Sequence, residues 1–455
     1  MGSLPCTKTN AFSWKKLDEG HWRRPLAGME PVFLYFGNAT ASLAQGREHF
    51  VIYSIIKVET TAKLEVENIE HAWKSLRFEQ PGLATTADAR DWSMHYRVPD
   101  KAALQDWVSQ MVQVVRNGPA AQVYAILDSI HTATIYWLPD SNELIFRLPH
   151  WQADGIGSWL LWDAFLTKLC NAKSAPQPKW GEEVANLKPS LEAIWAHGEI
   201  EAKHAEKGEK NLMFWLTQAP GVGPPTMTPA IGKSQYTELI FDQETTSKII
   251  EKCHEQNITV TAAVHAALAL ANNSVEQRVD DPRTANYVSM IIFNVRNYLG
   301  ELYAKSESAA NLYFTNLAIV APIGNFKDMS RHFQNHYKGV VKDLHSMAQV
   351  TSQFEKAVSQ MVQSPAFHAA PVQGDALLSS LGVAERFFKR RYGDVEIVDL
   401  RNGADIVLGL AMVFVYTFGD RLRLTYYYNE AAQDGKMIRR ILDGTGEFLK
   451  QGLRM

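Results

Sequence analysis

Hydrophobic residues recur along the chain with two periods, one typical of strands and one typical of helices. In the first half, runs rich in β-branched and aromatic residues predict strands at 31–38 and 49–59 and a hairpin over 132–149. Apolar residues at helical spacing predict helices at 66–80, 101–117 and 158–169. Strands and helices therefore alternate in this half, and one helix comes directly after the hairpin.

Residues 176–232 differ from the rest of the chain, because proline and glycine cluster there as they do at a crossover between domains. After this segment, strands are expected at 236–242, 285–299 and 311–324, and a hairpin over 407–429 that turns at Gly419-Asp420. Helices are expected at 243–257, at 258–273, from 326 onward and at 437–453, with a loop, a helix and a strand in succession over 377–400. The pattern predicts an α/β fold (α+β layers) in two domains, 1–210 and 233–455, joined by a linker over 211–232.

The composition narrows the class of protein without identifying it. A length of 455 residues suits two domains, and 46% hydrophobic with 21% charged residues is a globular balance. A net charge of -3 gives no overall attraction to nucleic acid or to an anionic membrane, so neither is an expected partner. Three widely spaced cysteines exclude a disulfide framework and a CxxC zinc site. Because the first residues contain no apolar secretory signal, a cytoplasmic location is expected.

The most informative stretch is His150-Trp-Gln-Ala-Asp154-Gly155, which lies between the predicted hairpin and the helix over 158–169. A histidine at the end of a strand can act as a general base for a hydroxyl group, because its unperturbed pKa is about 6.5. Asp154 could orient His150, or it could point away and pair with an arginine to fix the loop. Gly155 permits a backbone path that a Cβ would crowd. The alternative is a turn without a catalytic role, because H-x-x-x-D occurs often by chance.

The other histidines favour structural roles. His265 lies in an alanine-rich predicted helix and is expected in the core or along a cavity wall. His332 and His336 are four residues apart, but no glutamate follows His332 as the HExxH zinc signature requires. A solvated helix face is therefore expected there, and no metal.

The segment LPHWQADGIGSWLL resembles the HxxxDG motif of the coenzyme A-dependent acyltransferase superfamily. This superfamily includes chloramphenicol acetyltransferase, the plant BAHD acyltransferases, fungal alcohol acetyltransferases and the condensation domains of peptide synthetases. Further segments resemble family elements in the same order: Gln80-Pro81-Gly82-Leu83, 257–271, Asn294-Val295-Arg296 and Ser379-Ser380-Leu381-Gly382. The resemblance covers the chain from Pro31 to its last residue. At 416–420 only Phe-Gly remains of the BAHD motif DFGWG, and the chain is more similar to fungal O-acetyltransferases of secondary metabolism, such as those acting on the 15-hydroxyl of trichothecenes.

The resemblance implies two chloramphenicol-acetyltransferase-like domains with a tunnel between them, in which His150 is the base. Asp154 would be a structural brace paired with Arg296, and no covalent enzyme intermediate would form. Acetyl-CoA would be the donor, and the acceptor would be a hydroxyl of a small apolar sesquiterpenoid such as a trichothecene. Candidates for binding substrate or stabilising an oxyanion are Trp151, Asn294, Ser379, Ser380 and Gly382. The basic run 387–391 is expected on a helix face, where it could alternatively meet coenzyme A phosphates. A monomer is expected, because two domains of one chain can build the tunnel.

Two other functions are compatible with the same residues. A condensation enzyme would join carrier-bound acyl groups through an amide or ester bond, although a chain without a carrier domain favours free coenzyme A. A binding protein on the same scaffold would have no activity, although the intact His150, Asp154 and Gly155 favour an enzyme.

Overall fold

The structure is a computed structural model of the chain. It describes residues 11–41, 47–61, 63–116, 118–124, 127–171, 178–195, 200–218, 221–224, 232–275, 286–340, 342, 344–365, 367 and 374–455. All structural statements below concern these residues.

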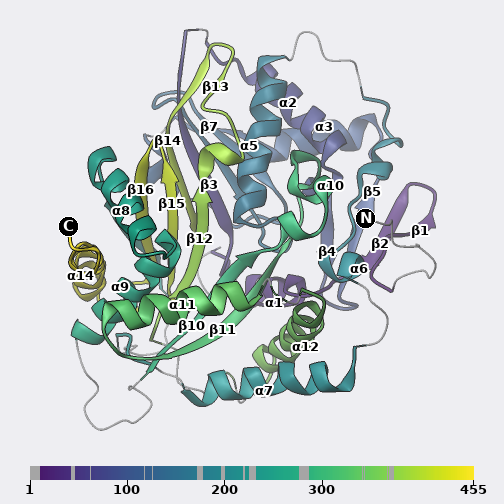
Figure 1. Ribbon diagram of the computed structural model, residues 1–455. Coiled ribbons are helices and arrows are strands. Elements are labelled where there is room, and N and C mark those ends of the chain that lie inside the picture. The colour runs from purple at the N-terminus through teal and green to yellow at the C-terminus, as the bar shows by residue number, and fades with distance from the viewer. Residues whose placement is uncertain are drawn as a thin grey trace.

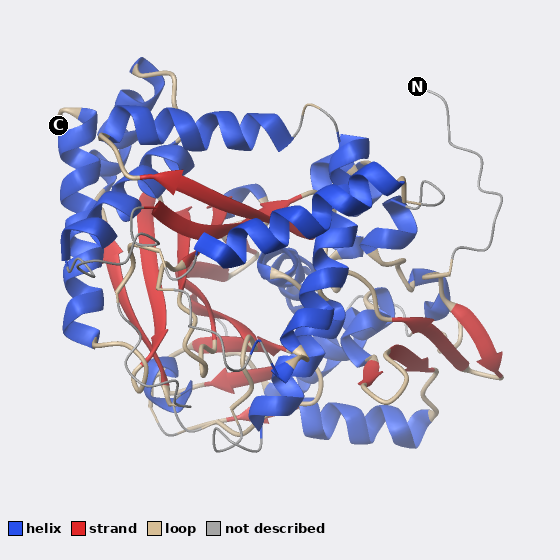
Figure 2. Cartoon of the chain, turned by 90° about the horizontal axis from the view of Figure 1, so that it is seen from below, coloured by secondary structure: helices blue, strands red, loops and turns tan. Residues whose placement is uncertain are grey.

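Two six-stranded sheets form the centre of the molecule (Figure 1). The first sheet has the order β13 (Arg391–Tyr392), β14 (Val395–Ala404), β3 (Ile52–Thr60), β8 (Glu143–Leu148), β7 (Thr134–Leu138) and β6 (Val112–Val114). The second sheet has the order β11 (Phe314–Pro322), β10 (Asn286–Asn294), β12 (Leu377–Val383), β15 (Met412–Phe418), β16 (Arg421–Asn429) and β9 (Ser234–Ile240). A small sheet of β1 (Lys15–Asp18), β2 (His21–Pro25), β5 (Ser93–Arg97) and β4 (Thr86–Asp88) lies at the edge of the molecule (Figure 2).

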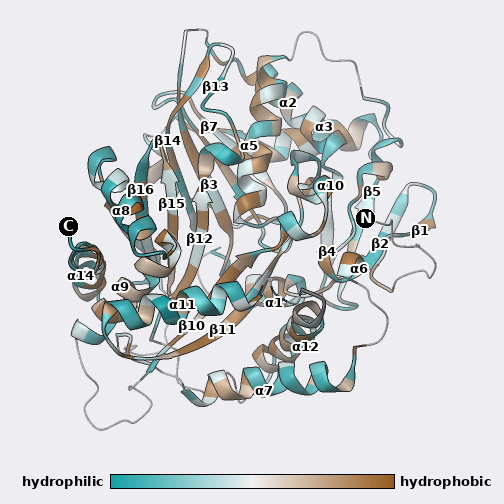
Figure 3. Ribbon diagram, viewed as in Figure 1, coloured by the Kyte–Doolittle hydropathy of each residue, from teal (hydrophilic) through white to brown (hydrophobic). Residues whose placement is uncertain are grey.

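Helices surround these sheets. Those of the first half are α1 (Glu30–Ala41), α2 (Val66–Glu79), α3 (Lys101–Met111), α4 (Ala120–Val123), α5 (Gly155–Cys170), α6 (Leu191–Trp195) and α7 (Ala202–Gln218). Those of the second half are α8 (Gln243–Glu255), α9 (Val260–Val275), α10 (Glu301–Ala304), α11 (Phe326–Val340), α12 (Leu344–Val362) and α14 (Gly435–Leu453). Figure 3 shows hydrophobic residues concentrated on the strands and on α5, with hydrophilic residues on much of α8 and α11.

The two halves of the sequence interlock through β14. This strand belongs to the second half but pairs antiparallel with β3 of the first half, from Val395 opposite Thr60 to Ala404 opposite Ile52. At the predicted crossover, α7 continues without a break past residue 211, where the linker was expected to begin. The predicted α/β architecture is present, and the first sheet takes the two strands at one edge, β13 and β14, from the second half. The division at 210 and 233 stays a prediction.

Several sequence predictions are confirmed in detail. The helix α2 buries Ile69, Ala72, Trp73 and Leu76 on one face. The strands β15 and β16 form the predicted hairpin, and its turn residues Gly419 and Asp420 both have positive φ angles, 59° and 58°. A two-residue hairpin turn of type I′ requires this conformation at both positions.

Three local predictions are wrong. Residues 31–38 are not a strand but the core of α1, whose buried Val32, Phe33, Phe36 and Thr40 follow helical spacing. The predicted helix over 101–117 ends at Met111, because residues 112–114 pair with β7. Of the segment 377–400, the expected loop is β12, and the expected basic helix is a short 3-10 turn leading into β13. Residues 112–114 and β12 pair with strands that are distant in the sequence, and this pairing overrides the local pattern.

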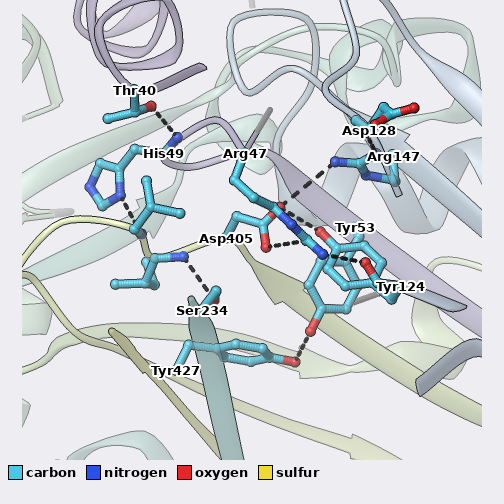
Figure 4. Close-up of polar contacts among 12 residues, drawn as sticks. Thr40, Arg47, His49, Tyr53, Tyr124, Asp128, Arg147, Ser234, Asp405 and Tyr427 are labelled. Atoms are coloured by element: carbon cyan, nitrogen blue, oxygen red, sulfur yellow. Dashed lines mark hydrogen bonds and ion pairs between the residues drawn. The ribbon is translucent and has the colours of Figure 1, made fainter. Parts of the chain in front are cut away.

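A buried polar cluster around Asp405 joins the end of β14 to the first half (Figure 4). Tyr124 donates a hydrogen bond to the Asp405 carboxylate at 2.8 Å, and Arg47 donates one at 3.3 Å. The Arg147 guanidinium lies 3.9 Å from the same carboxylate. These contacts make Asp405 a second tie between the halves, beside the pairing of β14 with β3.

Among the described residues, no single helix is long and apolar enough to cross a membrane. The consecutive helices α8 and α9, which are bent by 100° relative to each other, pass that test only as a pair and only by length and composition.

Candidate active site

His150 lies two residues beyond the end of β8, at the turn that leads into α5. Its ring stacks face to face on Phe33 of α1, with ring centroids 3.9 Å apart, and lies 5.8 Å from the ring of Phe314 on β11. Burial among these apolar rings lowers the pKa of His150 to about 4. The imidazole is therefore neutral at neutral pH and is free to accept a proton.

Asp154 is the N-cap residue of α5 and makes three strong contacts. Its carboxylate accepts a hydrogen bond from the backbone N–H of Gly157 at 2.6 Å and another from the backbone N–H of Tyr313 at 2.9 Å. The Arg296 guanidinium donates to the same carboxylate at 2.5 Å. In the described structure neither carboxylate oxygen hydrogen-bonds to His150. Of the two roles open to Asp154, the geometry favours the brace.

Arg296 is itself held in place on the second half of the chain. Its guanidinium also donates to the carbonyl of Asn311 at 3.2 Å and lies 5.2 Å from the centroid of the Tyr313 ring. Its backbone N–H donates to the side-chain oxygen of Asn294 at 3.1 Å. Arg296 and Asp154 are both almost fully buried, so the pair is shielded from water.

Two glycines at the start of α5 allow close packing, and only one of them was singled out from the sequence. A Cβ on Gly155 would lie 3.0 Å from the flexible end of the Leu381 side chain. A Cβ on Gly157 would lie only 2.3 Å from the backbone oxygen of Ala309, which cannot move aside alone. Gly157 therefore sets how closely α5 approaches the second half, and the sequence shows only a G-x-G spacing as a sign of it.

A cavity of about 300 Å³ lies beside His150, between the two halves. Its walls are mainly apolar and come from α1, β3, α5, α7, β10, β11, α12, β12 and β15. The few polar side chains among the residues that line it are His150, Asp154, Asn294, Arg296, Asn316, Ser379 and Ser380. Such a cavity suits a largely apolar molecule with a small number of polar groups near the histidine.

Of the remaining predicted site residues, some line the cavity and others lie outside it. Ser379 and Ser380 line the cavity from β12, and the Ser380 hydroxyl is 2.8 Å from the hydroxyl of Thr261. Trp151, expected at the acceptor pocket, is not among the cavity residues, because it packs into the core beside a separate small pocket. Gly382 also lies outside the cavity lining and occupies a bulge of β12 with φ +82°.

The other histidines and the basic run do not enter the site. His265 is buried and its two ring nitrogens lie 2.8 Å from the Tyr337 hydroxyl and 3.1 Å from the Tyr287 hydroxyl, which is a core position. His332 is exposed on α11. Residues 387–391 form no helix face, since Phe388 is buried and the chain turns there.

Sequence reasoning missed Phe33, Phe314 and Asn316. Phe33 was assigned to a strand, and the strong apolar pattern of 31–38 gave no sign of a helix over the histidine. Phe314 and Asn316 lie two positions apart on β11 and so share one face of that strand, but no local pattern in the sequence marks either of them.

Comparison with known proteins places this geometry in context. No family model matches the chain. It is 27% identical to acetyltransferase pigO of Monascus ruber over 92% of this chain and 93% of that protein. It is 25% identical to O-acetyltransferase pigM of the same organism over 95% of this chain and 85% of that protein.

Solved structures share the fold at lower identity. Trichothecene 15-O-acetyltransferase TRI3 from Fusarium sporotrichioides superimposes with a TM-score of 0.83 at 16% identity, over 99% of this chain and 100% of that chain. The first condensation domain of the CDA synthetase superimposes with a TM-score of 0.66 at 10% identity, over 95% of this chain and 96% of that chain.

The fold and these relatives support the resemblance seen in the sequence, which is to the coenzyme A-dependent acyltransferase and condensation-domain superfamily. Two chloramphenicol-acetyltransferase-like halves form its fold. The chain is an enzyme, an acyltransferase.

Proposed function

We propose that the protein transfers an acetyl group from acetyl-CoA to a hydroxyl group of a small, largely apolar secondary metabolite. The observation that supports this most directly is a neutral histidine beside an apolar cavity between the two halves. The names of pigO, pigM and TRI3 support acetyl as the group transferred. One chain supplies every wall of the cavity, so we propose that a monomer is sufficient.

In the proposed reaction the acceptor hydroxyl approaches His150 in the cavity and the thioester carbonyl lies against it. His150 takes the hydroxyl proton as the oxygen attacks the carbonyl carbon. The tetrahedral intermediate collapses, the C–S bond breaks and the thiol leaves with the proton from His150. The products are the acetyl ester and coenzyme A, and no bond to the enzyme forms. Ser379 is the candidate donor to the oxyanion, because it lines the cavity from β12.

The acceptor is proposed by class. TRI3 is a trichothecene 15-O-acetyltransferase, which supports a hydroxylated sesquiterpenoid such as a trichothecene. A further relative, 23% identical over 69% of this chain, is azaphilone biosynthesis cluster protein M of Aspergillus terreus, which supports a hydroxylated polyketide. A panel of hydroxylated terpenoids, polyketides and simple alcohols, with acetyl-CoA as donor and mass detection of the product, decides between these classes.

His150→Ala tests the proposal, because it removes the base and leaves the brace of Asp154 intact. We expect kcat to fall by roughly 10²–10⁴-fold while the fold survives. The release of free thiol from acetyl-CoA is followed with a colorimetric reagent. His332→Ala is the matched control, because His332 is an exposed histidine of α11 away from the cavity. A His150→Ala enzyme that works at the parental rate would refute the base.

Two alternative functions predict other results in the same assay. Turnover only with an acyl group on a carrier protein would favour a condensation enzyme. Tight calorimetric binding of a small molecule without turnover from any acyl donor would favour a binding protein.

A further inference from the structure

Most polar side chains that line the cavity already take part in contacts within the protein. Asp154 and Arg296 pair with each other, and the side-chain oxygen of Asn294 accepts a hydrogen bond from the backbone of Arg296. The Ser380 hydroxyl lies 2.8 Å from the hydroxyl of Thr261. These contacts hold the walls in place and leave few groups to recognise a bound molecule.

Asn316 of β11 is an exception among these lining residues. It is 4% exposed, and its side-chain nitrogen has no hydrogen-bond partner among the described residues. Two other lining residues contain such an atom: Nδ1 of His150, and Nε of Arg296, whose guanidinium is already bound to Asp154. A buried N–H without a partner is costly, so the Asn316 amide in an apolar wall indicates a ligand atom that accepts a hydrogen bond.

The backbone around Asn316 is fixed without help from its side chain. The strand β11 forms one edge of the second sheet, and Glu355 of α12 lies against it. The Glu355 carboxylate, which is buried, accepts hydrogen bonds from the backbone N–H of Asn316 at 3.3 Å and from the Thr315 hydroxyl at 3.2 Å. The Asn316 amide is therefore held in one place while its own donor stays available, and such preorganisation favours binding.

Asn316 lies on the same face of β11 as Phe314, the ring beside His150. The two residues are two positions apart, which is about 7 Å along a strand. The Phe314 ring is 5.8 Å from the His150 ring. A molecule whose hydroxyl lies at His150 therefore reaches the Asn316 amide roughly one ring and its substituent further along the wall.

The wall between these two points favours unsaturated ring systems. Besides His150, seven phenylalanines and Trp215 line the cavity, together with four methionines. Two of these phenylalanines, Phe33 and Phe314, lie beside His150 with ring centroids 6.2 Å apart. Aromatic faces and polarizable thioethers make favourable contacts with other π systems. A neutral, unsaturated ring therefore fits this wall better than a saturated one of the same size.

We propose that Asn316 selects the acceptor by donating a hydrogen bond to a carbonyl oxygen conjugated to the ring that carries the reacting hydroxyl. The inference rests on the proposed acetyl transfer and deepens it, because it names the acceptor class as a hydroxylated, unsaturated ketone. Asn316 fixes the orientation of the ring while His150 takes the hydroxyl proton. An acceptor of the same shape without the carbonyl leaves the buried amide unpaired, which lowers its kcat/KM.

Two acceptors that differ only in the carbonyl group test this selection. The first is para-hydroxybenzophenone, and the second is para-benzylphenol, which has a methylene group in place of the carbonyl. Their kcat/KM values are measured with acetyl-CoA as donor by the release of free thiol. Asn316→Leu removes the amide at nearly constant volume and should lower the ratio of ketone to benzylphenol roughly tenfold. The difference in acidity between the two phenols cancels when this ratio is compared between the parent and the variant.

Met290→Leu is the matched control, because Met290 lines the same cavity from β10 and carries no hydrogen-bond donor. It should change both kcat/KM values together and leave their ratio as in the parent. A parental ratio in folded Asn316→Leu would overturn the proposal. An equal loss for both phenols would also overturn it, since Asn316 would then support only the shape of the wall.

A spectroscopic measurement on the parent needs no substitution. The ketone, para-hydroxybenzophenone with an isotopic label at its carbonyl carbon, is bound in the absence of acetyl-CoA, and its carbonyl stretch is followed by infrared difference spectroscopy. A hydrogen bond from Asn316 should lower the frequency of this stretch relative to the ketone in an apolar solvent. A frequency equal to that in the apolar solvent would overturn the proposal even if Asn316→Leu failed to fold.

The acceptor class and the acetyl transfer fail in different ways. If the chain acetylates saturated hydroxylated terpenoids and neither phenol, the proposal for Asn316 is overturned and the proposed function stands. If no hydroxylated acceptor receives an acetyl group from acetyl-CoA, the proposed function fails as well.

Discussion

Two buried aspartates tie the halves of this molecule together, and they differ in what else they touch. Asp154, from the first half, meets Arg296 of the second at 2.5 Å, at the wall of the cavity. Asp405, from the second half, meets Arg47 and Arg147 of the first at 3.3 and 3.9 Å, away from the cavity lining. The fold thus joins its halves twice through a buried aspartate and arginine, once with the aspartate in the first half and once with the aspartate in the second half. The carboxylate of the HxxxD motif is therefore one of two structural ties, and its nearness to His150 does not by itself make it part of the chemistry.

The largest effect is expected for Asp154→Asn. The asparagine can still cap α5, but Arg296 is left as a buried charge without its counter-ion, which costs about 3–5 kcal/mol of unfolding free energy. The rate of acyl transfer should fall too, because the loop that holds His150 loosens. Denaturant unfolding and thiol release measure the two effects. Asp100→Asn, at the exposed N-cap of α3, is the control for capping alone and should be nearly neutral. A variant with parental melting would return Asp154 to the role of helper to His150.

Asp405→Asn should cost about 3 kcal/mol of unfolding free energy, because Arg147 is fully buried and loses its counter-charge. Its effect on activity should be small at temperatures where the variant is folded, since Asp405 does not line the cavity. Unfolding free energy and turnover should be measured for Asp405→Asn and Asp154→Asn in parallel. The comparison shows whether Asp405 supports stability alone while Asp154 supports both stability and activity. Equal loss of activity in both variants would contradict that separation.

Glu48 makes the second tie sensitive to pH. Burial raises the pKa of its carboxyl from 4.5 to about 7, and the charge of Asp405 acts in the same direction. Below about pH 4.5 the group is protonated in both states, and stability is lost as the pH rises through about 7, by up to about 3 kcal/mol. Glu48→Gln should remove this part of the decline, which unfolding curves at several pH values would show. If the stability of Glu48→Gln declined by the same amount over this pH range, the decline would arise from other titratable groups.

The smallest effects are expected for the two glycines of α5. They test how closely this helix approaches the second half beside the Asp154–Arg296 pair. Gly157→Ala places a methyl group against the backbone of Ala309 and should cost about 1–3 kcal/mol of unfolding free energy. Gly155→Ala meets only the end of Leu381, which can move, so its cost should be lower. Melting temperatures of the two variants compare them directly, and the reverse order would show that the approach of α5 is not limited at Gly157.

The sequence predicted those parts of the molecule whose patterns are local. Helix α2, the hairpin of β15 and β16, and the order of strand, histidine and helix around His150 all follow from periodicity and turn residues. The sequence did not predict α1, because the aromatic residues of 31–38 by themselves favour a strand. Only the packing of this segment in the folded protein shows that it is a helix. Phe33, Asn316 and Asp405 have roles that depend on packing between distant segments, and no local pattern marks them.

The exchange of β14 between the halves has a consequence for how the chain reaches its native state. The first sheet ends with residues 395–404, which leave the ribosome long after β3 and β8. Until then, β3 has one unpaired edge, and pairing across more than three hundred residues closes a very long loop. The first half therefore cannot finish folding during its own synthesis. Its exposed strand edge must be kept from other chains until the last quarter of the protein has been made.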